Sequence, residues 1–156
     1  MIVNETNGKA FNGNLATLDA NNNVIDVTIS DNVIEASDET NSAKFTIAPY
    51  STGYSIQSNS GKYIGLTYYE NELEESADTK YVNTISFSSG TVSIKGTGNS
   101  SGTYVALKYN SSANRFRYYK SGQSDIALYK KGSGVNYTSY ITTCCRYKNQ
   151  IIFFKF

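Results

Sequence analysis

Short runs of alternating apolar and polar residues fill most of the chain, which is the period of a β-strand with one buried face. The run Val24–Ile29 places Ile25, Val27 and Ile29 on the same face. In Tyr54–Gly65, an alternating strand is followed by a tight Ser-Gly turn and a second short strand. Turn-forming Gly, Asn, Ser and Asp residues separate such runs at short intervals. The pattern predicts an all-β chain.

One stretch, Tyr68–Glu75, could instead be read as a helical turn. No apolar stripe continues its 3.6-residue period, so we expect a surface loop with Leu73 tucked beneath it. Its four glutamates are typical of a solvated face. A calcium site is the alternative, but the oxygen-ligand spacing of a calcium-binding loop is missing. Because the chain has no histidine, a Cys/His zinc site is excluded, and we predict neither a metal nor a cofactor.

The strand-turn-strand pattern occurs three times. The copies are marked by the turn glycines Gly8, Gly61 and Gly102, and they close on the apolar strands Phe45–Ile47, Ile85–Phe87 and Ile126–Leu128. In the second and third copies the closing strand begins 24 residues after the glycine. In the first copy the distance is 37 residues, a surplus of 13 that the Asn-rich stretch 21–31 absorbs. A fixed spacing of this kind indicates a repeated supersecondary unit.

Three units of about 40 residues predict a β-trefoil-like barrel, in which six strands close a barrel and three hairpins cap it. A β-sandwich is the alternative, because it also consists of short strands separated by regular turns. The module is expected to span residues 1–131, with repeats at about 1–47, 48–87 and 88–131. Residues 132–156 are expected to be a linker and a C-terminal tail or extra strand. The apolar run Ile151–Phe154 in this tail either pairs with an open edge of the module or belongs to a neighbouring element.

Length and composition narrow the class of protein. The 156 residues suit one domain, and a net charge of +1 gives little attraction for a phosphate backbone, so we predict no nucleic-acid partner. No apolar stretch reaches the ~20 residues that span a bilayer. The abundance of Tyr, Thr, Asn, Ser and Gly is typical of a secreted β-module. No signal sequence opens the chain, so we expect a fragment of a secreted or cell-surface protein.

The two cysteines, Cys144 and Cys145, are adjacent in the sequence. Adjacent Cα atoms lie about 3.8 Å apart, below the usual disulfide range of roughly 4.4–6.8 Å. A strained disulfide between neighbours would close no useful loop. We therefore expect the fold to be stabilised by its core.

Several segments carry a resemblance to a known module. They are IVNETNGKAFNG, YSIQSNSGKYIG, NTISFSSGTVSIKG, YVALKYN and NRFRYYKSGQSDIALYKK. Together they resemble a module of large secreted or surface proteins of gut bacteria, Bacteroidetes and Firmicutes especially, over roughly residues 2–131. The ending RFRYYKS…LYK is the most specific part. The family has no established activity and the module sits beside other domains, so the resemblance implies a non-enzymatic accessory role.

A looser resemblance, through YSIQSNSGKYIG, is to ricin-type and fascin-like β-trefoils. The ricin-type lectin pattern expects a Gln-x-Trp near the end of each unit. This chain has no tryptophan, so no sugar-binding residue is carried over from that family.

The residues do not frame a catalytic site. Without histidine there is no Ser-His or Cys-His pair. The chain has 13 acidic residues, but they cluster in polar loops rather than beside aromatic residues at strand ends, as a glycosidase pair would. We predict that the chain is not an enzyme.

Glycan binding is the function that the aromatic residues favour. A sugar site needs an aromatic face for stacking and polar side chains for the hydroxyl groups. The candidate ligand-binding residues are Tyr68, Tyr69, Asn71, Tyr109, Asn110, Arg115, Arg117, Tyr118 and Tyr119. In each adjacent tyrosine pair, one ring is expected in the core and the other at the surface. The alternatives are a protein-protein adhesion surface, and a structural spacer in which exposed Tyr and Arg side chains only cover the barrel.

Overall fold

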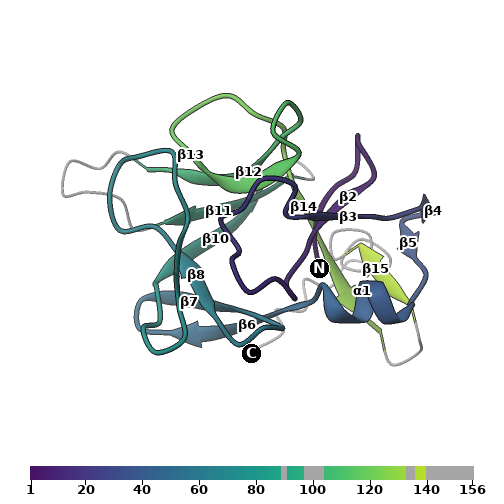
Figure 1. The fold of residues 1–156 in the computed structure, drawn as a ribbon, viewed down its shortest axis with the longest axis horizontal. Helices are drawn as coiled ribbons and strands as arrows, with labels where there is room; N and C mark the ends of the chain where they lie inside the picture. The colour runs from purple at the N-terminus through teal and green to yellow at the C-terminus, as the bar shows by residue number, and fades with distance from the viewer. Residues whose placement is uncertain (89–90, 97–103, 133–135, 140–156) are drawn as a thin grey trace.

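The computed structural model describes residues 1–88, 91–96, 104–132 and 136–139. Within these ranges the chain forms fifteen strands and one short helix (Figure 1). The prediction of an all-β chain is confirmed. Cys144, Cys145 and the Ile151–Phe154 run lie outside the described residues.

The strands form two curled sheets that pack together, as in the β-sandwich alternative (Figure 1). The seven-stranded sheet has the order β3-β2-β1-β14-β15-β5-β4. Its strands are β1 (Ile2–Asn4), β2 (Lys9–Phe11), β3 (Val24–Asp26), β4 (Ile29–Ser30), β5 (Val33–Ile34), β14 (Ala127–Lys131) and β15 (Tyr137–Ser139). All of its strand pairs are antiparallel.

The eight-stranded sheet has the order β13-β12-β11-β10-β7-β8-β9, and β6 pairs with β7 off this path. Its strands are β6 (Phe45–Tyr50), β7 (Gly53–Ser58), β8 (Tyr63–Gly65), β9 (Glu74–Ser76), β10 (Asn83–Ser88), β11 (Thr91–Gly96), β12 (Ala106–Asn110) and β13 (Arg115–Tyr119). Val92 and Ile94 of β11 are buried, as their alternation predicts.

The closing strand of each predicted unit pairs with the strand that opens the next. These pairs are β6 with β7, β10 with β11, and β14 with β1. The last pair brings the end of the third unit back to the start of the first. The trefoil arrangement with its threefold repeat, and the domain boundary at residue 131, stay predictions. Beyond that boundary, residues 137–139 add β15 to the seven-stranded sheet beside β14.

The turns follow the residue types that mark them in the sequence. Asp31 and Asn32 join β4 to β5 with φ of 51° and 61°, the two-residue hairpin geometry that Asp and Asn tolerate. Gly8 and Gly61 also have positive φ, 59° and 91°, which glycine adopts without steric strain. The third turn glycine, Gly102, lies outside the described residues.

The sequence pattern does not predict the helix α1 (Asp38–Ser42), because its residues are all polar. Its start is stabilised by a capping box between the N-cap Ser37 and Thr40, with acidic residues in the first turn. The helix is five residues long, so no helix of the described part of the chain has the length to cross a membrane.

Two hydrophobic cores lie on opposite faces of β1, which explains why all three of its residues are buried. Ile2 belongs to the main core, and its neighbour Val3 belongs to the second core. The main core contains Ile2, Phe11, Leu18, Ile56, Ile64, Leu66, Leu73, Val92, Ile94, Val105, Leu107, Tyr109, Phe116, Tyr118 and Ile126. The second core contains Met1, Val3, Ala10, Ile25, Ile34, Ala43, Ala127, Tyr129 and Tyr137.

The second core also explains the Val24–Ile29 run. Ile25 is buried in this core, and Val27 and Ile29 pack against it, as their shared face predicts. The run is divided between β3 and β4, however, rather than forming one strand.

Candidate functional site

The structure brings four of the nine predicted ligand-binding residues to one surface. Tyr68, Tyr69 and Asn71 lie on the loop of residues 66–73, and Arg117 reaches this loop from β13. Lys120, the residue after β13, also contacts the loop through Asn71. We call the set Tyr68, Tyr69, Glu70, Asn71, Arg117 and Lys120 the loop site.

Backbone amides at the end of β13 hold the loop through hydrogen bonds. The Tyr118 amide donates to the Glu72 carbonyl at 3.2 Å, and the Lys120 amide donates to Asn71 Oδ1 at 2.9 Å. Leu73 is buried beneath the loop, as predicted, with 3% of its surface exposed. These contacts hold the loop in place against β13.

Arg117 fixes the loop from a second direction. Its Nη1 donates to the Asn71 carbonyl at 2.8 Å, while Nε and Nη2 donate to the two carboxylate oxygens of Asp19, each at 2.6 Å. The guanidinium and carboxylate groups are both mostly buried, at 21% and 17% exposure. Hydrogen bonding to Asp19 raises the pKa of Arg117 above its ordinary value.

The two tyrosines of the loop differ in exposure, as predicted for this pair. Tyr68 is 37% exposed, and its hydroxyl donates to Glu72 Oε2 at 2.5 Å. This hydrogen bond raises the pKa of Tyr68 to about 12, so the ring stays neutral at ordinary pH. Tyr69 packs against the main core, and Lys120 Nζ lies 5.0 Å from the centre of its ring.

The glutamates of this stretch each accept a specific hydrogen bond rather than facing solvent alone. Glu70 pairs with Lys120 at 2.8 Å, and Glu75 pairs with Lys62 at 2.6 Å. Glu74 accepts from the Thr67 amide and hydroxyl at 2.5 and 2.7 Å. Across the residues that the structure describes, no three acidic or cysteine side chains are grouped as metal ligands.

Three predicted site residues lie in the protein interior. Tyr109, Tyr118 and Tyr119 are only 2%, 0% and 5% exposed, so none can stack on a sugar. The prediction that one ring of the Tyr118–Tyr119 pair faces solvent is wrong, because the end of β13 is covered on both faces. Tyr118 donates to Asn83 Oδ1 at 2.5 Å, and burial raises the pKa of Tyr118.

The remaining two predicted residues stabilise the turn between β12 and β13. Asn110 Oδ1 accepts from the Ala113 amide at 3.1 Å, and Arg115 Nη1 donates to Asn21 Oδ1 at 3.0 Å. This turn is at the opposite end of β13 from Lys120. Asn110 therefore stabilises the turn, Arg115 joins this end of β13 to Asn21, and neither belongs to the loop site.

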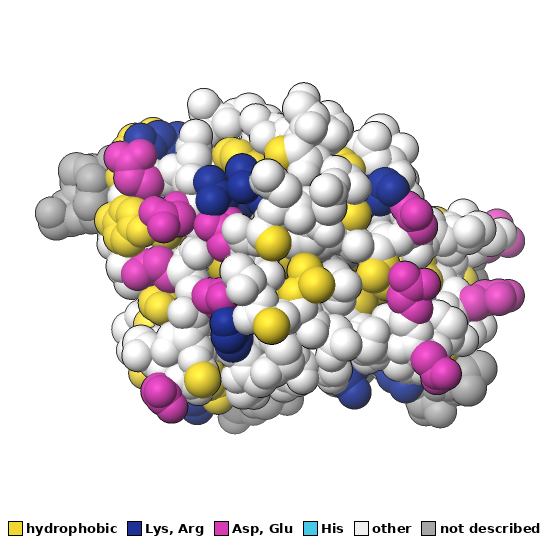
Figure 2. Space-filling model, viewed as in Figure 1, with side chains coloured by type: hydrophobic (Ala, Val, Ile, Leu, Met, Phe, Trp, Pro, Cys, Tyr) yellow, Lys and Arg dark blue, Asp and Glu magenta, His cyan; other side chains and the backbone are white. Residues whose placement is uncertain are grey.

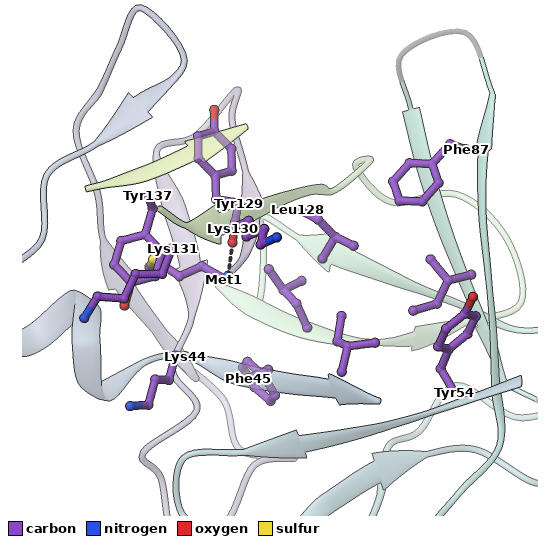
Figure 3. Close-up of a pocket in the computed structure, with 13 residues that line it drawn as sticks. Met1, Lys44, Phe45, Tyr54, Phe87, Leu128, Tyr129, Lys130, Lys131 and Tyr137 are labelled. Carbon is purple, nitrogen blue, oxygen red and sulfur yellow. Dashed lines mark hydrogen bonds between the residues drawn. The ribbon is translucent and has the colours of Figure 1, made fainter. Parts of the chain in front are cut away.

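Sequence reasoning missed an apolar pocket with a volume of about 310 Å³ (Figure 3). It is lined by Met1, Ile2, Lys44, Phe45, Ile47, Tyr54, Ile85, Phe87, Leu128, Tyr129, Lys130, Lys131 and Tyr137. Alternate residues of β6 and β10 and four successive residues of β14 supply much of the wall. These closing strands are apolar in the sequence, but their pattern does not indicate that a cavity separates them.

Charged side chains of both signs are interspersed on the face shown in Figure 2. No protein-family model, no curated protein and no solved structure matches this chain. Its function is therefore inferred from its own residues.

Proposed function

We propose that this chain is a non-catalytic module that binds glycans at the loop site and serves as an accessory part of a secreted or cell-surface protein. One observation carries the proposal. The Tyr68 ring is exposed on a loop that is held against β13 and that also carries Asn71 and Glu70, the partner of Lys120.

These groups match the chemistry of a sugar. The C–H face of a pyranose ring packs on an exposed aromatic ring, and its hydroxyl groups need both donors and acceptors. Tyr68 supplies the ring, the Asn71 side-chain NH₂ is a donor, and Glu70 is an acceptor. Because the loop is held by Arg117 and by β13, little conformational entropy is lost on binding.

The carboxylates of the loop support a binding role rather than a catalytic one. A glycosidase needs one carboxylic acid and one carboxylate that flank the bond to be cleaved. Here Glu72 and Glu74 accept hydrogen bonds from Tyr68 and Thr67, which are contacts that shape the loop. The resemblance to accessory modules of gut-bacterial surface proteins supports the same role and the same location.

The proposal is tested with a glycan array, followed by titration of the best glycan against Tyr68→Ala. Tyr50→Ala is the matched control, because Tyr50 is 36% exposed and Tyr68 is 37% exposed. We expect Tyr68→Ala to weaken binding at least tenfold and Tyr50→Ala to leave it unchanged. Tyr68→Phe, which keeps the ring, should retain most of the affinity.

Two results would contradict the proposal. One is a blank array with protein that is folded by circular dichroism, which would direct the search to a protein partner. The other is an equal loss of affinity in Tyr68→Ala and Tyr50→Ala, which would place the glycan elsewhere.

A further inference from the structure

The apolar pocket is built by both sheets (Figure 3). Strands β1, β14 and β15 of the seven-stranded sheet and strands β6, β7 and β10 of the eight-stranded sheet supply most of its lining. The described lining shares no residue with the loop site. The pocket is therefore a separate candidate for ligand binding.

The wall of the pocket retains exposed apolar surface. Phe45 and Ile47 of β6, Ile85 of β10 and Leu128 of β14 pack against the main core, but each is only partly buried. Phe87, two positions after Ile85 on β10, is 47% exposed. Side chains two positions apart on a strand share a face, so β6 and β10 each turn an apolar face to the pocket. Exposed apolar surface that is gathered in a hollow is typical of a ligand-binding site.

Polar groups at the pocket already have partners within the protein. The Met1 amino group donates to the Tyr129 carbonyl (Figure 3). The Tyr129 hydroxyl donates to Glu5 Oε1 at 2.6 Å, and the Tyr137 hydroxyl donates to Asn41 Oδ1 at 3.0 Å. These groups therefore need no hydrogen bond from a ligand.

Two of the lysines at the pocket do not direct their charge into it. The ammonium groups of Lys44 and Lys131 point away from the pocket (Figure 3), and that of Lys131 donates to Asn41 at 2.7 Å. A charged ligand would have to leave water without meeting either of these groups, and burial of an unpaired charge is costly. The lining therefore favours an uncharged ligand.

The size of the pocket and its aromatic rings indicate the class of ligand. Its volume is about 310 Å³. An engineered apolar cavity of roughly 150 Å³ binds benzene, so this pocket has room for about two rings. Phe45 lies at the base, and Tyr54 and Phe87 lie on one side (Figure 3). Aromatic rings pack on one another in offset or edge-to-face geometry, which favours a ligand that is itself aromatic.

We propose that this pocket binds a small neutral aromatic compound of about two rings, held between Ile47, Ile85 and Leu128. The apolar wall selects for hydrocarbon surface and against charge, and the aromatic side chains select for a ring. The site and its ligand are independent of glycan binding.

The probe is prodan, a neutral naphthalene derivative whose fluorescence shifts to shorter wavelength in apolar surroundings. Naphthalene and 2-naphthalenesulfonate are then compared as competitors, because they share the same rings and the second alone carries a charge. We expect prodan to bind the full chain with a shift to shorter wavelength. Naphthalene should displace it at a concentration about tenfold or more below that of the sulfonate, because the sulfonate loses its hydration on entry.

Adjacent positions of β6 provide a matched pair of variants. Ile47→Asn places an amide in the apolar wall and should weaken prodan binding about tenfold or more. Thr46→Asn introduces the same side chain on the opposite, exposed face of the strand and should have little effect. Ile85→Trp fills the pocket with an apolar ring and should also weaken binding, which separates lost space from added polarity. Circular dichroism checks that each variant is folded.

Four outcomes would overturn the proposal. The folded chain could fail to bind prodan, or the two competitors could be equally effective, which would show that the pocket does not exclude charge. Equal losses in Thr46→Asn and Ile47→Asn would place the dye elsewhere. Binding that appears only in Phe153→Asp/Phe154→Asp would show that the tail of this chain occupies the pocket. The glycan affinity of the pocket variants should stay unchanged, so failure here is distinct from failure at the loop site.

Discussion

The loop site and the apolar pocket differ in how their polar groups are satisfied. At the loop site, the charges of Arg117 and Lys120 are paired with Asp19 and Glu70. The pocket is instead lined mainly by apolar side chains. A surface whose charges are already paired suits a neutral polyol, whereas an apolar wall suits an apolar group.

Both surfaces nevertheless rest on the same main core. Tyr69 of the loop site packs against it, and so do Phe45, Ile47, Ile85 and Leu128 of the pocket. A substitution in the main core should therefore weaken binding at both sites, whereas a substitution at the surface of one site should weaken binding at that site alone. This difference can be tested with three changes of decreasing effect.

The largest effect is expected from Phe116→Ala. Phe116 is fully buried in the main core, stacks on Phe11 at 5.4 Å between ring centres, and contacts Tyr109 at 5.1 Å. Loss of the ring leaves a cavity, which should lower the free energy of unfolding by about 3–5 kcal/mol. Urea denaturation measures this, and glycan and naphthalene binding should weaken together.

The matched control is Phe87→Ala, since Phe87 is 47% exposed. It should change stability by less than about 1 kcal/mol. Its effect on binding should be confined to naphthalene. A Phe116→Ala variant as stable as the unmodified chain would contradict the description of the core.

A smaller effect, confined to the loop site, is expected from Arg117→Met. The variant removes the paired hydrogen bonds to Asp19 and the bond to the Asn71 carbonyl but keeps an unbranched side chain. We expect a loss of about 1–2 kcal/mol, because both charged groups are mostly buried. Glycan affinity should fall because the loop loses an anchor, and naphthalene affinity should not change.

Arg115→Met is the control on the same strand, at the turn where Arg115 bonds to Asn21. It should leave glycan binding intact. If Arg115→Met and Arg117→Met reduced glycan affinity equally, the assignment of glycan binding to the loop site would be wrong.

The smallest effect, when it is measured over a single pH unit, is a dependence of stability on pH near Met1. The Met1 amino group is buried and donates to the Tyr129 carbonyl, and burial lowers its pKa from 8.0 to about 5. Between pH 8 and pH 5 the unfolded chain binds a proton that the folded chain does not. Stability should therefore fall as pH is lowered through this range, by on the order of 1 kcal/mol per pH unit.

The absence of histidine makes this effect easy to isolate, because no other group ordinarily titrates between pH 6 and pH 7.5. Thermal unfolding of the chain with a free and with an acetylated α-amino group measures it. The acetylated chain should lose the dependence. A slope that persists after acetylation would show that another group is responsible.

Much of the fold could be predicted from local patterns. Val92 and Ile94 alternate with polar residues and are buried, and a turn forms at Asp31-Asn32, because both features depend on residues close in sequence. The helix α1 was missed although Ser37 and Thr40 form a capping box, since no apolar stripe extends over its five residues.

The candidate site was only partly predictable, because it depends on contacts between residues that are far apart in the sequence. Tyr118 and Tyr119 are both buried at the end of β13, and alternation within one strand does not tell whether its second face is covered. Arg117 was singled out as a ligand contact, yet its partner Asp19 lies 98 residues away in the sequence. The pocket depends on the spacing of six strands, which no single run of the sequence encodes.

The most direct test is a pair of NMR titrations on the ¹⁵N-labelled chain, one with the best glycan and one with naphthalene. We predict that the glycan shifts the amide signals of Tyr68–Asn71 and Lys120. We predict that naphthalene instead shifts those of Ile47, Ile85 and Leu128. If the glycan left the loop signals unmoved, or if both ligands shifted the same set, the assignment of glycan binding to the loop site would be wrong.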